Sequence, residues 1–330
     1  MNASEDLKET PLMWVYEFQQ QGVGKKVDRI PSSLNDLPKD RFYWFHLAYD
    51  APTSEQWLGH QGVEPLVIDA ITASETRPRT LAIEEGFLII LRGINKNEGD
   101  DPEDMISVRI WAKDNYIVTA RRTGRKLVSL TLLSDAFDSG NAPNSVNDFV
   151  ITLVTHLTSQ IHTVVEQSDE HLDSFENRIE QGDSNVNRGQ IVLLRQRVAA
   201  IRRFLAPQKE ALDTLSRLRK FFSEEESLHI REQTDRTLRY IEELDLLKER
   251  LLVMQDELRS QISEQQNMRM YVLSIVSMIF LPLSFLTGVF GMNVAGLPGT
   301  ENPLAFSVLA FGMIILAIAL LVFMRLRRWL

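Results

Sequence analysis

Two long apolar segments dominate the pattern of the chain and stand near its C-terminal end. They cover residues 270–290 and 304–324, and neither contains a charged residue. Each has about 21 residues, close to the roughly 20 that a helix needs to cross the hydrocarbon core of a bilayer. Buried helices of soluble proteins reach this length, but two such segments so close together favour a pair of transmembrane helices.

The region before the first apolar segment has an unbroken helical pattern. Residues 234–269 contain neither Pro nor Gly, and apolar residues recur there every three or four positions. These residues are Leu238, Ile241, Leu244, Leu247, Leu251, Met254, Leu258 and Ile262. Because this spacing is close to the coiled-coil repeat of about 3.5, residues 233–269 are predicted as a stalk helix that continues into the first span. Its narrow apolar stripe needs partners, from its own chain or from other copies.

The first 125 residues predict a cytoplasmic α/β domain. Short apolar and β-branched runs between turn residues predict strands at 13–18, 43–47, 87–92, 107–112 and 116–120. Lys113-Asp114-Asn115 forms a short link between the last two strands, and a helix is expected at 64–73.

Residues 126–232 predict a cytoplasmic helical region, because the strand pattern disappears there. The expected helices cover 127–137, 146–180, 189–218 and 223–230. Ser223 followed three residues later by Glu226 is typical of a capping box at a helix start.

Basic residues flank the pair of spans and predict their orientation. The loop at 291–303 between the spans has no Lys or Arg, so it is expected outside, in the periplasm. Both termini are then cytoplasmic, and residues 325–330 form a basic cytoplasmic tail. The flanking residues are Arg259 and Arg269 before the spans, and Arg325, Arg327 and Arg328 after them.

Composition narrows the class of protein and of partner. The chain has 330 residues, with 36 Lys+Arg against 45 Asp+Glu and a formal net charge of −9. This acidity argues against nucleic acid as a partner, because phosphate binding needs clustered basic residues. The chain has no cysteine, which excludes disulfides and thiolate zinc sites. The acidic start of the chain holds no apolar segment, so no signal peptide is expected.

One face of the first span collects small and polar residues at a spacing of three and four. Its members are Asn267, Met270, Ser274, Ser277, Leu281, Ser284, Gly288 and Gly291. Such a face serves either close helix packing, for which Ser284 and Gly288 are suited, or the lining of a water-filled pore. Because two helices per chain cannot enclose a pore, the second interpretation requires a ring of identical subunits.

Other candidate chemistry is sparse. His162 and Glu166 share a helix face that Asp169 and Asp173 continue, which offers a cytoplasmic metal site or simply a solvated acidic face. The segment 22–25 lacks the upstream Gly of a phosphate loop, and the basic cluster at 121–126 is interpreted as a turn or a subunit contact. No nucleophile–base motif is present, so an enzyme is not expected.

Several motifs indicate a family. Gly291-Met292-Asn293 stands at the outer end of the first span, and the chain ends in Arg327-Arg328-Trp329-Leu330. In these features the sequence resembles the CorA superfamily of divalent-cation transporters, the 2-TM-GxN family, and most of all its ZntB zinc-transporter branch. The further motifs that carry the resemblance are Glu75-Thr76-Arg77-Pro78-Arg79, Leu91-Arg92-Gly93-Ile94-Asn95, Arg202-Arg203-Phe204-Leu205-Ala206-Pro207-Gln208 and Phe285-Leu286-Thr287-Gly288-Val289-Phe290-Gly291.

The resemblance implies a funnel-shaped homopentamer in the bacterial inner membrane. Each subunit has an αβα sandwich, a long stalk helix that runs into the pore-lining first span, and a second span in an outer ring. Gly291, Met292 and Asn293 match the family's selectivity filter. The matching pore-lining positions are Asn267, Met270, Leu273, Ser277, Leu281, Ser284 and Gly288. Arg325, Arg327 and Arg328 then form a basic ring, and Glu301 is the single acid of the loop.

The implied cargo is a divalent cation, with Zn²⁺ first and Mg²⁺, Co²⁺ or Ni²⁺ as alternatives; no cofactor is implied. A ring of Asn293 amide oxygens can accept hydrogen bonds from a hydrated ion without stripping its water, although Asn293 could instead cap the helix. The apolar residues Met270 and Leu281 can gate by dewetting. The sequence leaves a passive channel and a proton-coupled carrier both open, and a non-conducting membrane-anchored sensor or scaffold is the alternative of a different class.

Overall fold

The computed structural model describes residues 11–19, 24–27, 33–181, 188–292, 294, 297, 299 and 302–327. Contacts between residues divide the chain into two compact units, Met1–Gln255 and Asp256–Leu330.

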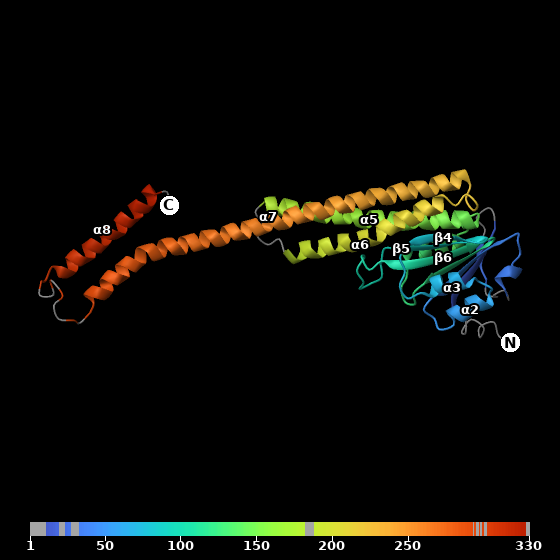
Figure 1. Cartoon of the computed structure of the whole chain (residues 1–330), viewed down its shortest axis with the longest axis horizontal. Helices are drawn as coiled ribbons and strands as arrows, with labels where there is room; N and C mark the ends of the chain where they lie inside the picture. The colour runs from blue at the N-terminus through green and yellow to red at the C-terminus, as the bar shows by residue number, and fades with distance from the viewer. Residues whose placement is uncertain are drawn as a thin grey trace. The chain divides into compact units, whose positions relative to one another are not determined.

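The first unit is built around a seven-stranded mixed sheet (Figure 1). Its strand order is β2-β1-β3-β7-β6-β5-β4, and every neighbouring pair is antiparallel except β3 and β7. The strands are β1 (Leu12–Phe18), β2 (Gly24–Lys26), β3 (Phe42–Ala48), β4 (Arg79–Ile83), β5 (Gly86–Gly93), β6 (Ile106–Lys113) and β7 (Tyr116–Arg121). All five strands expected from the sequence are present.

Alternation along the strands divides the apolar residues between two cores. In β5, Phe87, Ile89 and Leu91 face one core, whereas Leu88 and Ile90 face the other, as the two-residue period of a strand requires. Helices α2 (Ser54–His60) and α3 (Pro65–Thr72) cover the second face. Helices α4 (Val128–Asp138), α5 (Val146–Glu180) and α6 (Arg188–Ser216) cover the first. The αβα layering is therefore confirmed.

Two edge strands, β2 and β4, are absent from the sequence prediction. Strand β2 has the sequence GKK and two of its residues are exposed, and β4 has only one fully buried residue, Thr80. Edge strands carry a weak apolar pattern because one side of each has no neighbour. Both strands form through backbone pairing with β1 and β5, which the local sequence does not reveal.

Helix α7 (Glu224–Phe290) is a single helix of 67 residues, roughly 100 Å at 1.5 Å per residue. The predicted capping box is confirmed, because Glu226 Oε2 accepts from the Ser223 amide at 2.7 Å and Ser223 Oγ accepts from the Glu226 amide at 3.2 Å. The sequence interpretation separated a helix at 223–230 from a stalk beginning at 233. No such separation exists, because no Pro or Gly interrupts the segment and the helix continues through it.

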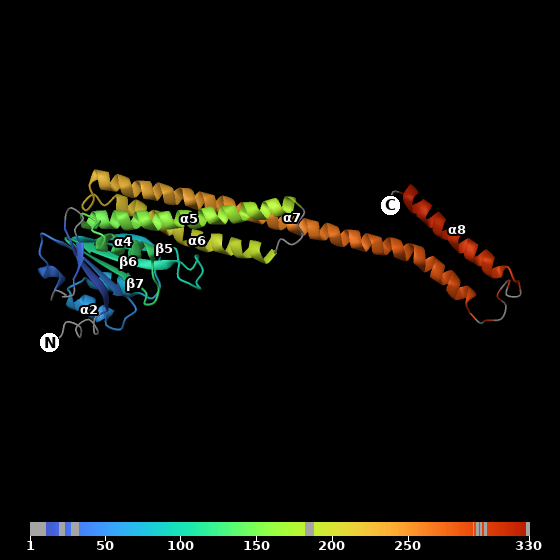
Figure 2. The same cartoon turned by 180° about the vertical axis from the view of Figure 1, so that it is seen from behind.

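The N-terminal part of α7 finds its partners within its own chain. Helices α5, α6 and α7 lie side by side in both views (Figures 1 and 2). Leu244, Leu247, Leu251 and Met254 are buried on α7, as the apolar stripe predicts. Polar contacts join the same helices, since Arg202 of α6 donates to both carboxylate oxygens of Asp245. After Met254 the burial stops.

Candidate ion pathway

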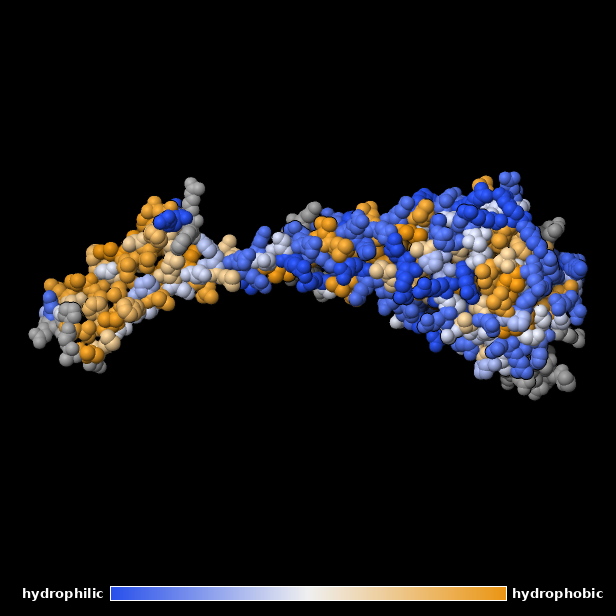
Figure 3. Space-filling model, in the orientation of Figure 1, coloured by the Kyte–Doolittle hydropathy of each residue, from blue (hydrophilic) through white to orange (hydrophobic). Residues whose placement is uncertain are grey.

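The first predicted span forms the last part of α7 and the second forms α8 (Ala305–Leu326). Both helices are long and apolar enough to cross a membrane, and none of their most apolar stretch is buried within the chain. Figure 3 shows apolar side chains spread over the surface of the second unit, which contains both spans. Between residues 256 and 292 no residue is buried. A water-exposed helix of this composition would be unfavourable, so lipid or other protein chains must cover it.

All seven predicted pore-lining positions are exposed in the single chain. The larger ones show high exposed fractions, 64% for Met270, 67% for Leu273 and 72% for Leu281. The smaller or polar ones, which are also exposed, are Asn267, Ser277, Ser284 and Gly288. Within the described residues this face has no covering partner, so helix packing requires a neighbouring chain and pore lining requires a ring of copies.

The hydroxyl groups of this helix are partly satisfied by its own backbone. Ser274 Oγ donates to the Met270 carbonyl at 2.8 Å, and Ser277 Oγ donates to the Leu273 carbonyl at 2.9 Å. Thr287 Oγ1 donates to the Ser284 carbonyl at 2.9 Å. Because each hydroxyl already donates to the helix backbone, it leaves no unpaired donor whether it packs against another helix or faces water. Its oxygen can still accept a hydrogen bond from water.

The outer end of the span depends on a glycine at 291. Its amide donates to the Thr287 carbonyl at 2.9 Å, and a Cβ at this position would lie 2.8 Å from the same oxygen. Any side chain would therefore clash with backbone where the helix ends, which explains why Gly begins the Gly-Met-Asn motif. Met292 is 49% exposed. Asn293, Glu301 and Arg328 lie outside the described residues.

The described arginines of the C-terminal tail lie at the end of α8. Arg325 is in the last turn, and the guanidinium of Arg327 lies 5.7 Å from the ring centroid of Phe323. Positive charge at a helix C-terminus interacts favourably with the helix dipole.

The four α5 residues that the sequence offered as a cytoplasmic metal site or a solvated acidic face do not gather into one cluster in the structure. His162 Nε2 lies 3.9 Å from Glu166, and its ring stacks on Tyr240 with centroids 5.5 Å apart. Asp169 and Asp173 do not join them, because Arg250 of α7 binds both carboxylates. Among the described residues no group of three His, Asp or Glu side chains is placed to hold a metal ion.

The sequence interpretation missed a cavity in the first unit whose walls are rich in arginine. It joins the segment after α3, strands β5 and β6, the turn after β7, and α6. Three of the motifs quoted for the family resemblance contribute Arg77, Arg92 and Arg203, and the basic cluster at 121–126 contributes Arg122 and Arg125. The basic cluster at 121–126 was the one sequence signal of this cavity, but the residues that complete the cavity wall are far away in the sequence.

Comparisons with known proteins match nearly the whole chain. The family model described as "CorA-like Mg2+ transporter protein" matches residues 39–328. The "Divalent cation transporter CmaX" of Pseudomonas aeruginosa is 34% identical over 310 residues, 93% of each chain. The "Zinc transport protein ZntB" of Yersinia enterocolitica is 29% identical over 319 residues, 96% of each chain.

Solved structures agree in fold. Full-length CmaX gives a TM-score of 0.82 at 32% identity, covering 96% of this chain and 98% of that one. The CorA magnesium transporter of Methanocaldococcus jannaschii gives a TM-score of 0.79 at 18% identity, with the same coverage, and so shares the fold. The family model covers most of the chain, and CmaX is 34% identical to it. These two findings show that the chain belongs to the CorA-like transporter family, whose members are membrane transporters of divalent cations and not enzymes.

Proposed function

We propose that this chain forms a homopentameric pore that carries divalent metal ions across the bacterial inner membrane, with zinc as the leading substrate. The observation that carries the proposal is the exposure of all seven predicted pore positions on a part of α7 where no residue is buried. Family membership supports the same conclusion, and relatives named as zinc transport proteins support zinc.

The proposed filter is a ring of Asn293 side chains at the outer end of the first spans, with Gly291 and Met292 shaping the approach. Neutral amide oxygens accept hydrogen bonds from the water shell of an ion and let it leave again, which a ring of carboxylates would oppose. Below the filter, Ser284, Ser277 and Asn267 offer polar contacts between the apolar levels at Leu281, Leu273 and Met270. The apolar levels gate by excluding water when the ring of helices narrows.

The substrate range follows from the absence of soft ligands. Neither span contains His or Cys, so the pore has no side chain that selects Zn²⁺ by direct coordination. Passage of hydrated ions should therefore admit Zn²⁺, Co²⁺ and Ni²⁺, and also Mg²⁺, which is the physiological cargo in the alternative CorA-type function. Neither span contains Asp, Glu, Lys or Arg, so a proton that is coupled to transport must move through water or through groups outside the spans.

The proposed orientation has both termini in the cytoplasm and places the α/β unit there. Residues 1–125, 126–232 and 233–269 then form the cytoplasmic part, 270–290 and 304–324 the spans, and 291–303 the periplasmic loop. The basic residues that end the chain support this orientation, because Arg and Lys are enriched on the cytoplasmic side.

Flux measurement in proteoliposomes tests the function. The full chain is reconstituted, and uptake of Zn²⁺ and of Mg²⁺ is followed with an enclosed indicator, with and without a pH gradient. We expect uptake of both ions above that of protein-free liposomes. Acceleration by the gradient identifies a proton-coupled carrier, and equal rates identify a channel. Absence of flux for every divalent ion would support a sensor or scaffold in its place.

Assembly is tested separately by native mass spectrometry in detergent. Five copies should give about five times the chain mass of 37.8 kDa. A stable monomer or dimer would remove the pore, because one or two copies cannot surround an ion path.

A further inference from the structure

The arginine-rich cavity of the first unit has a volume of about 890 Å³. Two carboxylates line it, Glu75 and Asp104, against six arginines. The arginines are Arg77, Arg92, Arg109, Arg122, Arg125 and Arg203. Such a surplus of positive charge in one cavity contrasts with the net charge of −9 for the chain, and like charges gathered this closely repel one another.

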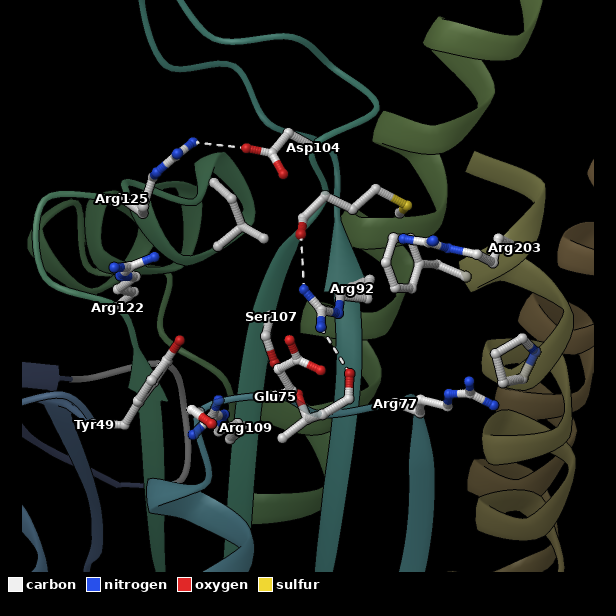
Figure 4. Close-up of a pocket in the computed structure, with 16 residues that line it drawn as sticks. Tyr49, Glu75, Arg77, Arg92, Asp104, Ser107, Arg109, Arg122, Arg125 and Arg203 are labelled. Atoms are coloured by element: carbon white, nitrogen blue, oxygen red, sulfur yellow. Dashed lines mark hydrogen bonds and ion pairs between the residues drawn. The ribbon is translucent and has the colours of Figure 1, made fainter. Parts of the chain in front are cut away.

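Two of these arginines lie at the base of the cavity and are tied to backbone (Figure 4). Arg92 donates from Nη1 to the Met105 carbonyl at 2.9 Å and from Nη2 to the Thr76 carbonyl at 2.7 Å. Arg109 is fully buried, donates from Nη1 to the Ile71 carbonyl, and its guanidinium carbon lies 3.4 Å from the centroid of the Tyr49 ring.

Neither guanidinium is neutralised or fully paired. Within the described residues no carboxylate forms an ion pair with Arg92 or Arg109, and the Nε atom of each is buried without a hydrogen-bond partner. Burial lowers the pKa of Arg109 to about 10; the charge of Arg92 acts in the same direction, and the weaker opposing effects of Tyr49 and Asp50 do not offset the loss of hydration. A buried cation without a counter-ion is costly, and an anion in the cavity would remove that cost.

Two further arginines stand exposed on another wall of the cavity. Arg203 lies 4.8 Å from the centroid of the Phe204 ring, and no ion pair joins Arg203 or Arg77 to a described carboxylate. The arginines of the turn after β7 differ, because Arg125 binds Asp100 at 2.5 Å and Arg122 lies 3.9 Å from Asp50. Figure 4 shows Arg77 and Arg203 on one side and Arg122 and Arg125 on the other, with Arg92 and Arg109 between them.

We propose that this cavity is a binding site for a small molecule that carries two or more linked phosphate groups. Guanidinium groups present planar pairs of donors that fit phosphate oxygens, and four of them here have no carboxylate partner in the described part of the chain. The volume lies in the usual range for small-molecule sites, roughly 300–1,000 Å³, and far exceeds that of a single phosphate ion. The transported cations are excluded by charge, so the site is distinct from the ion path.

A purely structural role explains only part of the arrangement. Through their carbonyl contacts, Arg109 connects α3 to the sheet and Arg92 connects the segment after α3 to it, which stabilises the fold. That role does not explain Arg77 and Arg203, which are exposed and make no such contacts. These two residues are therefore suited to a test that leaves the fold intact.

Calorimetric titration of the full-length protein in detergent tests the proposal, after metal ions have been removed with a chelating resin. The probes are sodium tripolyphosphate, ATP and orthophosphate. We expect tripolyphosphate and ATP to bind at one site per chain and orthophosphate to bind at least about tenfold more weakly. Equal affinities for the first two identify the phosphate chain as the ligand, whereas tighter ATP binding identifies a nucleotide.

Variants connect the binding to the cavity. Arg77→Gln and Arg203→Gln should each weaken tripolyphosphate binding about tenfold, because each removes one charge-assisted contact. The control Arg231→Gln removes an exposed arginine of α7 that does not line the cavity, and its affinity should equal that of the unmodified protein. Absence of binding by both tripolyphosphate and ATP, or equal affinities for all three variants, would overturn the proposal.

Discussion

Arg250 of α7 holds Glu176 of α5 through two hydrogen bonds, from Nε to Oε1 at 3.1 Å and from Nη2 to Oε2 at 2.6 Å. The same guanidinium also binds Asp169 at 2.8 Å and Asp173 at 2.5 Å. One guanidinium thus binds three carboxylates of a helix that is far from it in the sequence. The contacts with Glu176 and Asp173 raise the pKa of Arg250. This network joins α5 to α7 near the last buried turn of the stalk.

Removal of this cation should destabilise the packing of α5 against α7. We expect Arg250→Gln to cost about 1–2 kcal/mol of unfolding free energy, since it leaves three carboxylates of one helix face without a partner. Arg236→Gln is the matched control, because Arg236 forms one exposed pair with Glu232 of its own helix, worth about 0.3–0.5 kcal/mol. Equal shifts of the denaturant midpoint in the two variants would contradict the prediction.

The same variant should leave the three carboxylates that Arg250 binds, those of Asp169, Asp173 and Glu176, open to a divalent cation. Added Zn²⁺ should therefore raise the melting temperature of Arg250→Gln by more than that of the unmodified protein. The difference should disappear when Asp173→Asn is combined with Arg250→Gln.

The buried His46 predicts a loss of stability in mild acid. Arg121 donates from Nε to His46 Nε2 at 3.1 Å, so the imidazole is neutral and its Nδ1 faces Thr119 Oγ1 at 2.7 Å. Burial, together with the charge of Arg121, holds the pKa of His46 well below its ordinary value of 6.5. Below about pH 6.5 the unfolded chain gains a proton that the folded chain does not, so stability is present above that pH and falls as pH decreases.

Melting temperatures measured between pH 7.5 and 5 check this effect. The contribution of one proton is at most about 1.4 kcal/mol per pH unit. His46→Gln should remove that part of the slope, whereas His60→Gln, at an exposed position of α2, should keep it. A slope that is unchanged in His46→Gln would assign the acid sensitivity to other groups.

Asn293 should be essential for flux and dispensable for assembly. Each hydrogen bond to the shell of a charged ion contributes about 1–3 kcal/mol, and Asn293→Ala removes all of those of the ring together. We expect this variant to lose most of its Zn²⁺ uptake in proteoliposomes while its native mass stays unchanged. Asn293→Asp should bind divalent ions more tightly and release them more slowly.

Competition at the same filter checks whether the ion passes hydrated. Excess Co²⁺, Ni²⁺ and Mg²⁺ should each slow Zn²⁺ uptake, because amide oxygens do not discriminate strongly among hydrated divalent ions. A Zn²⁺ rate that stays constant in large excesses of all three would show that a dehydrating zinc site exists.

Cysteine labelling checks the orientation, and the chain is suited to it because it contains no cysteine of its own. A Cys at Thr300, in the loop between the spans, should react with an impermeant maleimide added to intact cells. A Cys at Gln56, exposed on α2, should react only after the cells are opened. The reverse pattern would place the α/β unit outside.

Local patterns in the sequence were sufficient wherever one segment decides its own structure. The absence of charge over 270–290 and 304–324 predicted the two apolar helices, and the absence of Pro and Gly over 234–269 predicted that the stalk continues into the first span. The continuous apolar run at 87–92 predicted β5, because a strand covered on both faces of its sheet buries both sets of its side chains. Family motifs then indicated the transporter family, which the comparisons confirm.

Only the tertiary structure decided which distant side chains meet. The face that carries Asp169 and Asp173 has the same local pattern whether it binds a metal or an arginine, and the packing of α5 against α7 brought Arg250 to it. The cavity arginines come from segments around residues 77, 92, 109, 122 and 203, and sequence spacing does not reveal their convergence. Charges interact through space rather than along the chain, so the partners of a charged residue depend on the topology of the fold.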